Sequence, residues 1–467
     1  MSGFYVWGGD QPVKTTKDKL LRYSSALGLN ELPPAICDAV VVCRGIGLSY
    51  LWVDVLCILY DDPEDRIREL AVMSEIYRLS TVTICAASSS GVEHGFLYNR
   101  GYFYSARSSP PVRLRFRNKT GGEGVLLAFA TENQEDEPDY KAPIEERGWC
   151  YQERRLPPRV LYYGLRGLMY TCQHRQMRDR GPYGAVFRDV PVMPRPFEEP
   201  SFFTKDWMEI VSNYSRRLLS HPGDKLLACS AVASAAYRAS QQSSRTRQQK
   251  LSNTYLAGLW KDKLPVGLDW YVPPRASPDG ANRELRMRRS KYLAPTWSWA
   301  AVDSGVRFWS REPVDKVCKL PPTPSSKVRI ISAVANPETT GMPFGSGKDG
   351  LLVVKGGAAV AKWVPGADGA PDAISCGDFS FPVHRDSLEE GGDAAGFVQE
   401  PLLALRLLRG DVLNHHRGLN CGLVLRRVDK DHCARVGLFY CCREHEHNTG
   451  GCGQKFKGFK KQTVKII

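Results

Sequence analysis

The sequence predicts an α/β protein, with an N-terminal parallel sheet and flanking helices followed by a mixed helical and β-rich C-terminal region. Two apolar stretches, 50–59 and 81–87, have the length and composition of strands buried on both faces. A helical pattern lies between them, and strand–helix–strand order is typical of a parallel sheet. Beyond residue 320, β-branched runs alternate with stretches rich in Pro, Gly, Ser and Asp, which predicts strands joined by loops.

Two helices are predicted around these strands. The first follows Pro33-Pro34 and ends near Gly45 and Gly47, because proline suits a first turn and glycine suits an exit. The second starts at Asp62 and Pro63, as N-cap and first-turn residues. The side of this second helix that faces the core is expected to comprise Ile67, Leu70, Ala71, Ser74 and Tyr77.

The remaining chain gives weaker local patterns. Residues 100–145 are polar and indicate an insertion with a hairpin over 112–116 and 125–129, and residues 154–310 carry mostly helical patterns, including 207–219 and 225–237. Trp297 and Trp299, two apart, predict one face of a buried strand. Strands are also predicted at 328–335, 351–354, 402–408, 421–428 and 434–441. We therefore divide the chain into domains at 1–165, 166–310 and 311–467.

Composition predicts a soluble, cytoplasmic protein. The 467 residues include 42% apolar and 24% charged residues, which suits two or three folded domains. No apolar run approaches the roughly 18 residues that a membrane span needs, and the first ten residues lack the features of a signal peptide. Several of the 14 cysteines lie inside apolar runs, which favours buried free thiols in a reducing compartment.

The net charge of +14 permits contact with nucleic acid, nucleotides or acidic lipid but specifies none of them. The densest basic stretches lie at 283–291 and 455–465, and we interpret both as solvated surface or tail. Because no basic stripe alternates with aromatic residues, nucleic-acid binding is not expected.

Two motifs far apart in the chain carry a family resemblance. Residues 50–62, YLWVDVLCILYDD, and residues 147–154, RGWCYQER, resemble the family patterns YLWIDSLCIIQDD and R.W.LQER. Trp7-Gly8-Gly9 is similar to the end of a further motif of the same family. Together these motifs resemble the fungal heterokaryon incompatibility (HET) domain, and the resemblance extends over about residues 1–303.

The N-terminus departs from the family pattern. Phe4 stands where the family usually has serine, and Val6 stands where it has cysteine. We therefore expect an N-terminally short domain whose first strand is missing or degenerate.

The resemblance also implies a chemistry. HET domains are regarded as distant relatives of TIR domains, some of which cleave NAD with a glutamate in a WC..E box. Residues 149–153, WCYQE, are similar to that box, which makes Glu153 the candidate catalytic residue. A carboxylate can stabilise the positive charge that develops on ribose when the nicotinamide–ribose bond breaks. The other interpretation is a helix-start carboxylate paired with Arg147, Arg154 or Arg155.

The other candidate residues each allow two interpretations. Asp54, inside an apolar run, either lines a site at the strand's carboxyl end or holds a loop. Glu69 is either solvated or points toward Asp54. Arg147 binds a phosphate or holds Glu153. Trp149 either supports the site or stacks on an aromatic ring of a ligand. The motifs add Gln152, a Trp7–Gly8 loop that is a site rim or a packing feature, and Asp61 and Asp62, expected as caps of the next helix.

No resident cofactor or metal is expected, and NAD enters only as a substrate. No P-loop, GxGxxG or GxSxG pattern stands in a suitable context. A tail with Cys441, Cys442, His445, His447 and Cys452 holds enough zinc ligands but lacks a CxxC pair, which makes zinc a weak hypothesis.

As the resemblance implies, we expect a protein of non-self recognition, programmed cell death and innate immunity that has a protein partner or self-associates through its HET domain. Whether the protein is an enzyme stays open. The alternative is a non-enzymatic interaction module that assembles a death complex, with residues 147–154 as an assembly surface.

Overall fold

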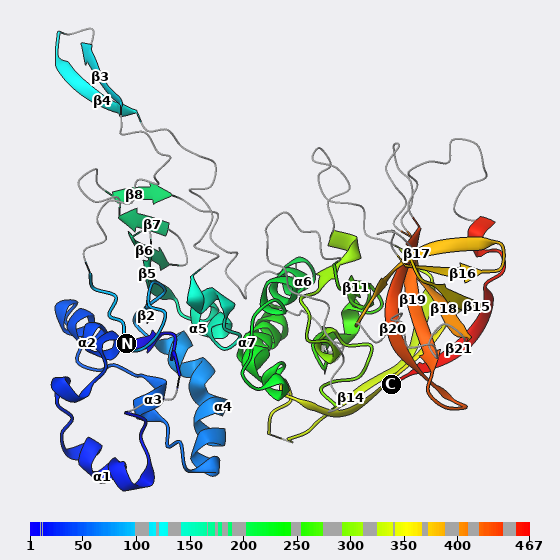
Figure 1. Ribbon diagram of the computed structural model, residues 1–467, viewed down its shortest axis with the longest axis horizontal. Helices are drawn as coiled ribbons and strands as arrows, with labels where there is room; N and C mark the ends of the chain where they lie inside the picture. Colours follow the sequence, from blue (N-terminus) through cyan, green and yellow to red (C-terminus); the bar gives the residue numbers. More distant parts are fainter. Residues whose placement is uncertain are drawn as a thin grey trace. The chain divides into compact units, whose positions relative to one another are not determined.

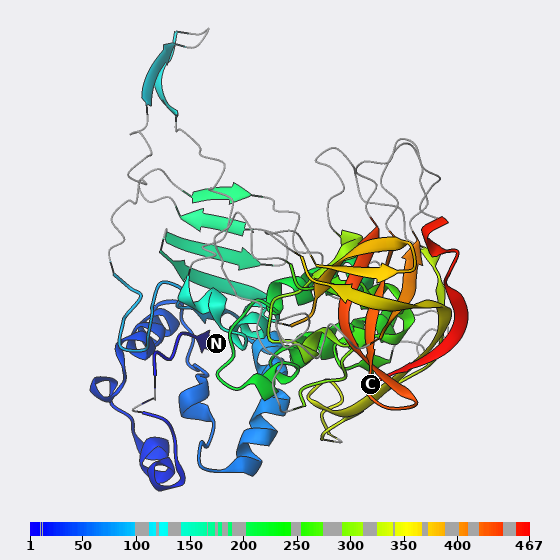
Figure 2. The ribbon, with the colours of Figure 1, turned by 45° about the vertical axis from the view of Figure 1, so that its right-hand side comes forward.

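A computed structural model of the chain describes most of the sequence in two compact units, Met1–Arg195 and Pro196–Ile467. Figures 1 and 2 show the two units from two directions. The described residues are 1–9, 11, 13–98, 112–117, 121–128, 142–165, 167–172, 176–179, 185–188, 202–243, 254–273, 292–311, 325–339, 341–366, 372–387, 401–409, 420–441 and 454–467.

The first unit is built on a six-stranded sheet with the order β1-β2-β5-β6-β7-β8 (Figure 1). The first three strands are parallel, which confirms the predicted parallel core, and the last three continue the sheet as an antiparallel meander. The strands are β1 (Ser2–Phe4), β2 (Thr83–Cys85), β5 (Arg159–Gly164), β6 (Gly167–Cys172), β7 (Gln176–Asp179) and β8 (Ala185–Arg188).

The first strand is present, contrary to the expectation from the N-terminal motif. Ser2 pairs with Thr83 and Phe4 with Cys85 in parallel register, and all three residues of β1 are buried. A hydrogen bond between the Ser2 and Thr83 hydroxyl groups, 2.7 Å, adds a side-chain contact. The unusual residues at positions 4 and 6 therefore do not prevent strand formation.

The predicted strand over 50–59 is wrong. Only Trp52 pairs with the sheet, as a single parallel bridge to Ser2, and the chain then turns into the short helix α3 (Asp54–Cys57). The Asp54 carboxylate accepts a hydrogen bond from the backbone N–H of Val55, 2.7 Å, which stabilises a helix start. An apolar run cannot by itself distinguish a buried strand from a buried helix turn.

Helices pack on both faces of the parallel part of the sheet. The helix α2 (Pro34–Gly45) begins after Pro33, as predicted, and its residues Ile36 and Ala39 share a core cluster with Tyr5 and Ile84. The helix α4 (Pro63–Leu79) lies on the other face, where the Tyr77 ring contacts Phe4 and Trp52. Neighbouring residues of β1 and the following loop thus point to opposite faces, as strand geometry requires.

The buried side of α4 agrees with the prediction at Tyr77 and differs from it elsewhere. Asp65, Met73 and Tyr77 are buried, whereas Ile67 is exposed. The sequence pattern locates the start of this helix correctly but not its orientation, because its apolar residues are spread around the helix.

The first unit has further short elements. The hairpin of β3 (Val112–Arg117) and β4 (Glu123–Ala128) confirms the predicted one. The remaining elements are α1 (Lys17–Ser25), η1 (Leu29–Glu31), η2 (Pro143–Glu146) and α5 (Cys150–Arg155).

The second unit begins with two helices, α6 (Phe202–Tyr214) and α7 (Leu227–Ser243), close to the predicted positions. Trp297 and Trp299 are fully buried but not in a strand, since Trp299 starts the turn η7 (Trp299–Ala301). The other short elements are η4 (Pro222–Asp224), β9 (Tyr255–Leu256), β10 (Leu259–Trp260), η5 (Lys261–Lys263), η6 (Val266–Leu268), β11 (Trp270–Tyr271), β12 (Arg307–Phe308) and η8 (Trp309–Arg311).

The C-terminal region is β-rich, as predicted, and its strands form a closed ring. The long strand β15 (Gly347–Val364) pairs with β18 over residues 358–361 and with β16 over residues 362–364, which closes the circuit β15-β18-β19-β20-β17-β16. The ring encloses an apolar core that includes Trp363, Phe381 and Phe439. The strands are β13 (Ser325–Ser326), β14 (Val328–Pro337), β16 (Ala373–Cys376), β17 (Phe379–Arg385), β18 (Leu402–Arg409), β19 (Asn420–Arg427), β20 (His432–Cys441) and β21 (Lys460–Ile466), with η9 (Gln454–Phe456) before β21.

A buried ion pair joins the ring to the preceding segment. Arg435 and Asp386 are fully buried, with Nε and Oδ2 3.0 Å apart. The Arg435 guanidinium also donates to the carbonyl groups of Leu268 and Trp270 and lies over the Trp270 ring. These contacts satisfy both charges inside the protein, which is the condition for tolerating them there.

No helix in the described ranges combines the length and apolar character needed to cross a membrane. The basic stretch 283–291 lies outside the described residues, as do Cys442, His445, His447 and Cys452 of the Cys/His tail. Cys441 ends β20 and is buried.

Candidate functional site

Three distant segments bring two carboxyl groups and a guanidinium together in the first unit. Asp54 begins α3, Glu153 lies in α5, and Arg147 follows η2. Asp54 acts electrostatically on Glu153, and Arg147 acts on both. The sequence motifs at 50–62 and 147–154 therefore meet in the fold.

Asp54 occupies the end of the sheet where a site is expected. It follows the bridging residue Trp52 by two positions, on the carboxyl side of the parallel strands. Its Oδ2 accepts a hydrogen bond from Trp7 Nε1, 3.1 Å. Burial raises the pKa of the Asp54 carboxyl, while the Val55 N–H, Arg147 and Trp7 oppose that shift. The residue as a whole is only half-buried, so its carboxyl is desolvated while the residue still reaches the surface.

Glu153 is more deeply placed. Its exposed fraction is 7%, and burial together with the nearby Asp54 raises its pKa to about 7. Arg147 and hydrogen bonds from the Cys150 thiol and the Tyr77 hydroxyl lower the pKa, but they do not offset the burial. Near neutral pH, Glu153 therefore exists in both protonation states.

Arg147 links the carboxyl groups of Asp54 and Glu153 to the segment that follows β1. One guanidinium nitrogen donates to the backbone carbonyl of Tyr5, 3.0 Å, in the segment directly after β1. Arg147 is half-buried, so its charge is shared between the carboxyl groups and the surface. Arg147 therefore connects the two carboxyl groups to the segment after β1.

Three tyrosines and a cysteine surround the carboxyl groups, and sequence reasoning did not select any of them for the site. Burial, followed by the charges of Asp54 and Glu153, raises the pKa of the Tyr5, Tyr60 and Tyr77 hydroxyl groups. Burial, followed by the charge of Glu153, also raises the pKa of the Cys150 thiol. Tyr60 and Cys150 lie within the two motifs, and this position is the sequence signal that could have identified them as site residues.

The Trp7–Gly8 loop forms one side of the site. The Trp7 ring packs against Tyr60 at 5.5 Å in addition to its bond to Asp54. Gly8 adopts a φ of +76°, and a Cβ at this position would lie 2.8 Å from the Gly91 Cα. Only glycine fits this turn without displacing backbone, so the loop geometry that presents Trp7 depends on it.

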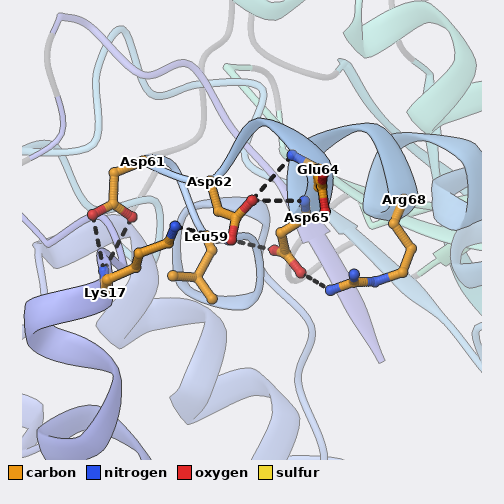
Figure 3. Close-up of polar contacts among 7 residues, drawn as sticks. All are labelled: Lys17, Leu59, Asp61, Asp62, Glu64, Asp65 and Arg68. Carbon is orange, nitrogen blue, oxygen red and sulfur yellow. Dashed lines mark hydrogen bonds and ion pairs between the residues drawn. The ribbon is translucent and has the colours of Figure 1, made fainter.

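Asp61 and Asp62 lie in a separate polar cluster at the starts of two helices (Figure 3). Asp61 accepts hydrogen bonds from the Lys17 N–H at the first turn of α1, 3.0 and 3.1 Å. Asp62 accepts from Glu64 N–H, 3.0 Å, and Asp65 N–H, 3.3 Å, as the N-cap of α4. Asp62 thus caps the helix as predicted, whereas Asp61 holds α1.

The remaining candidates lie on α4, on α5 or directly before α5. Glu69 is half-buried on α4, where its charge acts on Cys57. Trp149 is the half-buried residue before α5. Gln152 is buried on α5, and its Oε1 atom has no hydrogen-bond partner among the described atoms.

Chemically, the arrangement pairs two carboxyl groups with unequal environments beside one cation. Two buried carboxyl groups that lie close together do not both ionise readily, so they share one proton. Asp54 and Glu153 therefore titrate as a pair. Such a pair can supply one anion and one proton acceptor or donor near neutral pH. Among the described residues, no group of three or more His, Cys, Asp or Glu side chains is placed to hold a metal ion.

A comparison with protein families finds a match within the first unit. The model of the family described as heterokaryon incompatibility protein (HET) matches residues 4–153, a range that ends at Glu153. A search of curated proteins finds no match. A search of solved structures also finds none.

Proposed function

We propose that residues 4–153, which match the heterokaryon incompatibility family model, form a domain of that family. We propose that the protein is a fungal non-self recognition effector that triggers programmed cell death, a form of innate immunity, in the cytoplasm. We further propose that it acts by cleaving NAD at a TIR-like site. The observation that supports the enzymatic proposal is the approach of Asp54 and Glu153 beside Arg147.

The proposed reaction is hydrolysis of the bond between nicotinamide and ribose. That C–N bond breaks, its electron pair leaves with nicotinamide, and positive charge develops on the ribose. Water then forms the new C–O bond and releases one proton. An ionised carboxylate of the pair stabilises the positive charge and accepts the water proton, which a pKa of about 7 at Glu153 suits.

The residues around the pair fit the remaining parts of such a substrate. Arg147 is half-buried and cationic, as a ligand for a diphosphate must be. Trp7 and Tyr60 are half-buried aromatic residues next to Asp54, and they offer apolar ring surface to a base. Glu153 sits deepest, where water is excluded and charge effects are strong.

The test is nicotinamide release from NAD by the purified full-length protein. Glu153→Gln and Asp54→Asn should each reduce the rate by about a hundredfold or more, the scale of losing an electrostatic or acid–base group. Asp61→Asn is the matched control, because its carboxyl binds the Lys17 N–H in another cluster. In cells, Glu153→Gln should preserve NAD and abolish toxicity; unchanged toxicity with intact NAD would reject catalysis.

A second candidate function is non-enzymatic assembly through the same domain. The helix α1 buries no residue, and Leu21 on it is 83% exposed, which offers apolar surface to a protein partner or a second copy. Residues 150–153 are buried, so they do not favour an assembly surface at that motif.

The two proposed functions predict that different variants lose toxicity. If assembly alone causes death, Leu21→Ser abolishes toxicity and self-association, whereas Glu153→Gln leaves both unchanged. If catalysis causes death, Glu153→Gln abolishes toxicity while size-exclusion chromatography shows the same oligomeric state as the wild type.

A further inference from the structure

The outer strands of the second unit form a three-stranded face beside the closed ring. The strand β15 pairs with β14 on one side and with β21 on the other over residues 352–356 (Figure 1). Along β15, Leu352 and Val354 are fully buried on one face of the strand. Lys355, which points to the other face, is exposed. The opposite side of these strands is therefore an open sheet face.

This face collects basic residues from separate parts of the sequence. Arg329 of β14 lies directly opposite Lys355 of β15, and β21 adds Lys461, opposite Gly357, and Lys465, opposite Val353. All four basic side chains are exposed. We call Arg329, Lys355, Lys461 and Lys465 the basic face. The fold thus adds two residues from β14 and β15 to the C-terminal basic stretch of the sequence.

The basic face has little internal compensation. Within the described part of the chain, none of its four cations forms an ion pair. On β15, Asp349 is hydrogen-bonded to Asn336 opposite it. On the other side of β21, Lys465 lies opposite His432, to which the Asp429 carboxylate is hydrogen-bonded. Like charges directly opposite each other, as at Arg329 and Lys355, destabilise a sheet. An anionic surface placed against the face would remove that repulsion.

We propose that the basic face binds the surface of an anionic lipid bilayer. The face is a continuous sheet surface, and exposed Ile331 and Val334 on β14 supply aliphatic side chains at its margin. Basic side chains beside aliphatic ones suit the boundary between lipid headgroups and acyl chains. Binding at this face is peripheral and requires no membrane-spanning segment.

The same residues fit nucleic acid less well. Single-stranded binding uses exposed aromatic rings on which successive bases stack, whereas Phe459, the aromatic residue beside Gly357, packs its ring against the core of the closed ring. Duplex recognition places a helix or ribbon into a groove, whereas these positions lie on the face of a three-stranded sheet. Anionic lipid headgroups need only a surface of opposite charge.

The experiment measures co-sedimentation of the full-length protein with phosphatidylcholine vesicles that contain or lack phosphatidylserine. The wild type should bind only the vesicles with phosphatidylserine, and less so as salt rises. The double variant Lys355→Thr/Lys461→Thr should bind about 25-fold more weakly, since each cation near an anionic surface contributes about fivefold. The matched control, Arg115→Thr/Lys261→Thr, removes the same charge from exposed positions on β3 and η5 and should retain binding.

Circular dichroism and thermal unfolding establish that both variants fold, and Lys355→Thr removes a repulsion rather than a contact. The proposal is overturned if the wild type does not bind phosphatidylserine vesicles, or if the face and control variants lose binding equally. It is also overturned if the face variant loses binding to a single-stranded or duplex oligonucleotide but keeps its binding to vesicles.

Discussion

The substitution Glu153→Gln tests the buried carboxyl group through protein stability as well as through activity. Glutamine has nearly the shape of the protonated glutamic acid and keeps an oxygen that accepts hydrogen bonds from Tyr77 and Cys150. It cannot ionise. The variant therefore isolates the cost of placing a negative charge at this position.

The magnitude and its sign follow from the pKa. The folded state raises the pKa of Glu153 from 4.5 to about 7, so between these values the folded protein holds a proton that the unfolded chain has released. The stabilisation from protonated Glu153 is fully present below pH 4.5 and is lost as the pH rises to about 7. A shift of this size corresponds to about 3 kcal/mol.

The assay is urea unfolding of the wild type and of Glu153→Gln at a series of pH values between 4.5 and 8.5. At the acid end the two free energies of unfolding should agree. At the alkaline end the variant should be more stable, by up to about 3 kcal/mol, because only the wild type bears the buried charge. The difference between the proteins at each pH cancels the titration of the shared groups that do not interact with Glu153, and it includes the response of Asp54.

Two results would refute this reasoning. A difference that does not change with pH would mean that Glu153 titrates alike in the folded and unfolded chains and is therefore not desolvated. A variant that is less stable at every pH would mean that the ionised carboxylate makes favourable contacts, as in an ordinary ion pair with Arg147.

Three further substitutions test the supporting structure, each by urea unfolding. Gly8→Ala should destabilise the first unit by about 1–3 kcal/mol, because alanine at this positive φ would strain the backbone and press against Gly91; an unchanged midpoint would contradict the loop geometry. Asp62→Ala should cost about 1 kcal/mol through loss of the α4 cap, and no loss would mean that another group satisfies those N–H donors. Arg435→Met should cost about 3–5 kcal/mol because Asp386 stays buried without its partner. Arg435→Met/Asp386→Leu should recover much of that loss, and a double variant as unstable as the single one would argue against the charge-pair explanation.

Local chemistry made part of the fold predictable. Pro33 and the Asp62-Pro63 pair predicted the starts of α2 and α4, because a cap or a fixed φ acts within a few residues. The run at 81–87 predicted β2 because it is short, apolar and flanked by polar residues. The β-rich C-terminal region was predictable for the same reason.

Tertiary pairing was not predictable from such patterns. The run at 50–59 has the composition of a strand, yet only Trp52 finds a pairing edge before Asp54 starts a helix. Trp297 and Trp299 are buried as expected, but the size of their rings, not a strand period, places them in the core. The closure of the ring depends on β15 pairing with β18 across an intervening hairpin, which no single segment encodes.

In the candidate site, the motifs identify the residues and the strand topology brings them into contact. The motifs predicted Asp54, Arg147 and Glu153 as residues, but their contact depends on the segment after β1, where Tyr5 accepts from Arg147 and Trp7 donates to Asp54. Because β1 pairs between Trp52 and β2, it fixes where both bonds can form. A departure from the family pattern at positions 4 and 6 is therefore tolerated as long as the backbone of β1 stays paired. The hydrogen bonds to the site come from the Tyr5 carbonyl and the Trp7 ring, and neither position 4 nor position 6 supplies one.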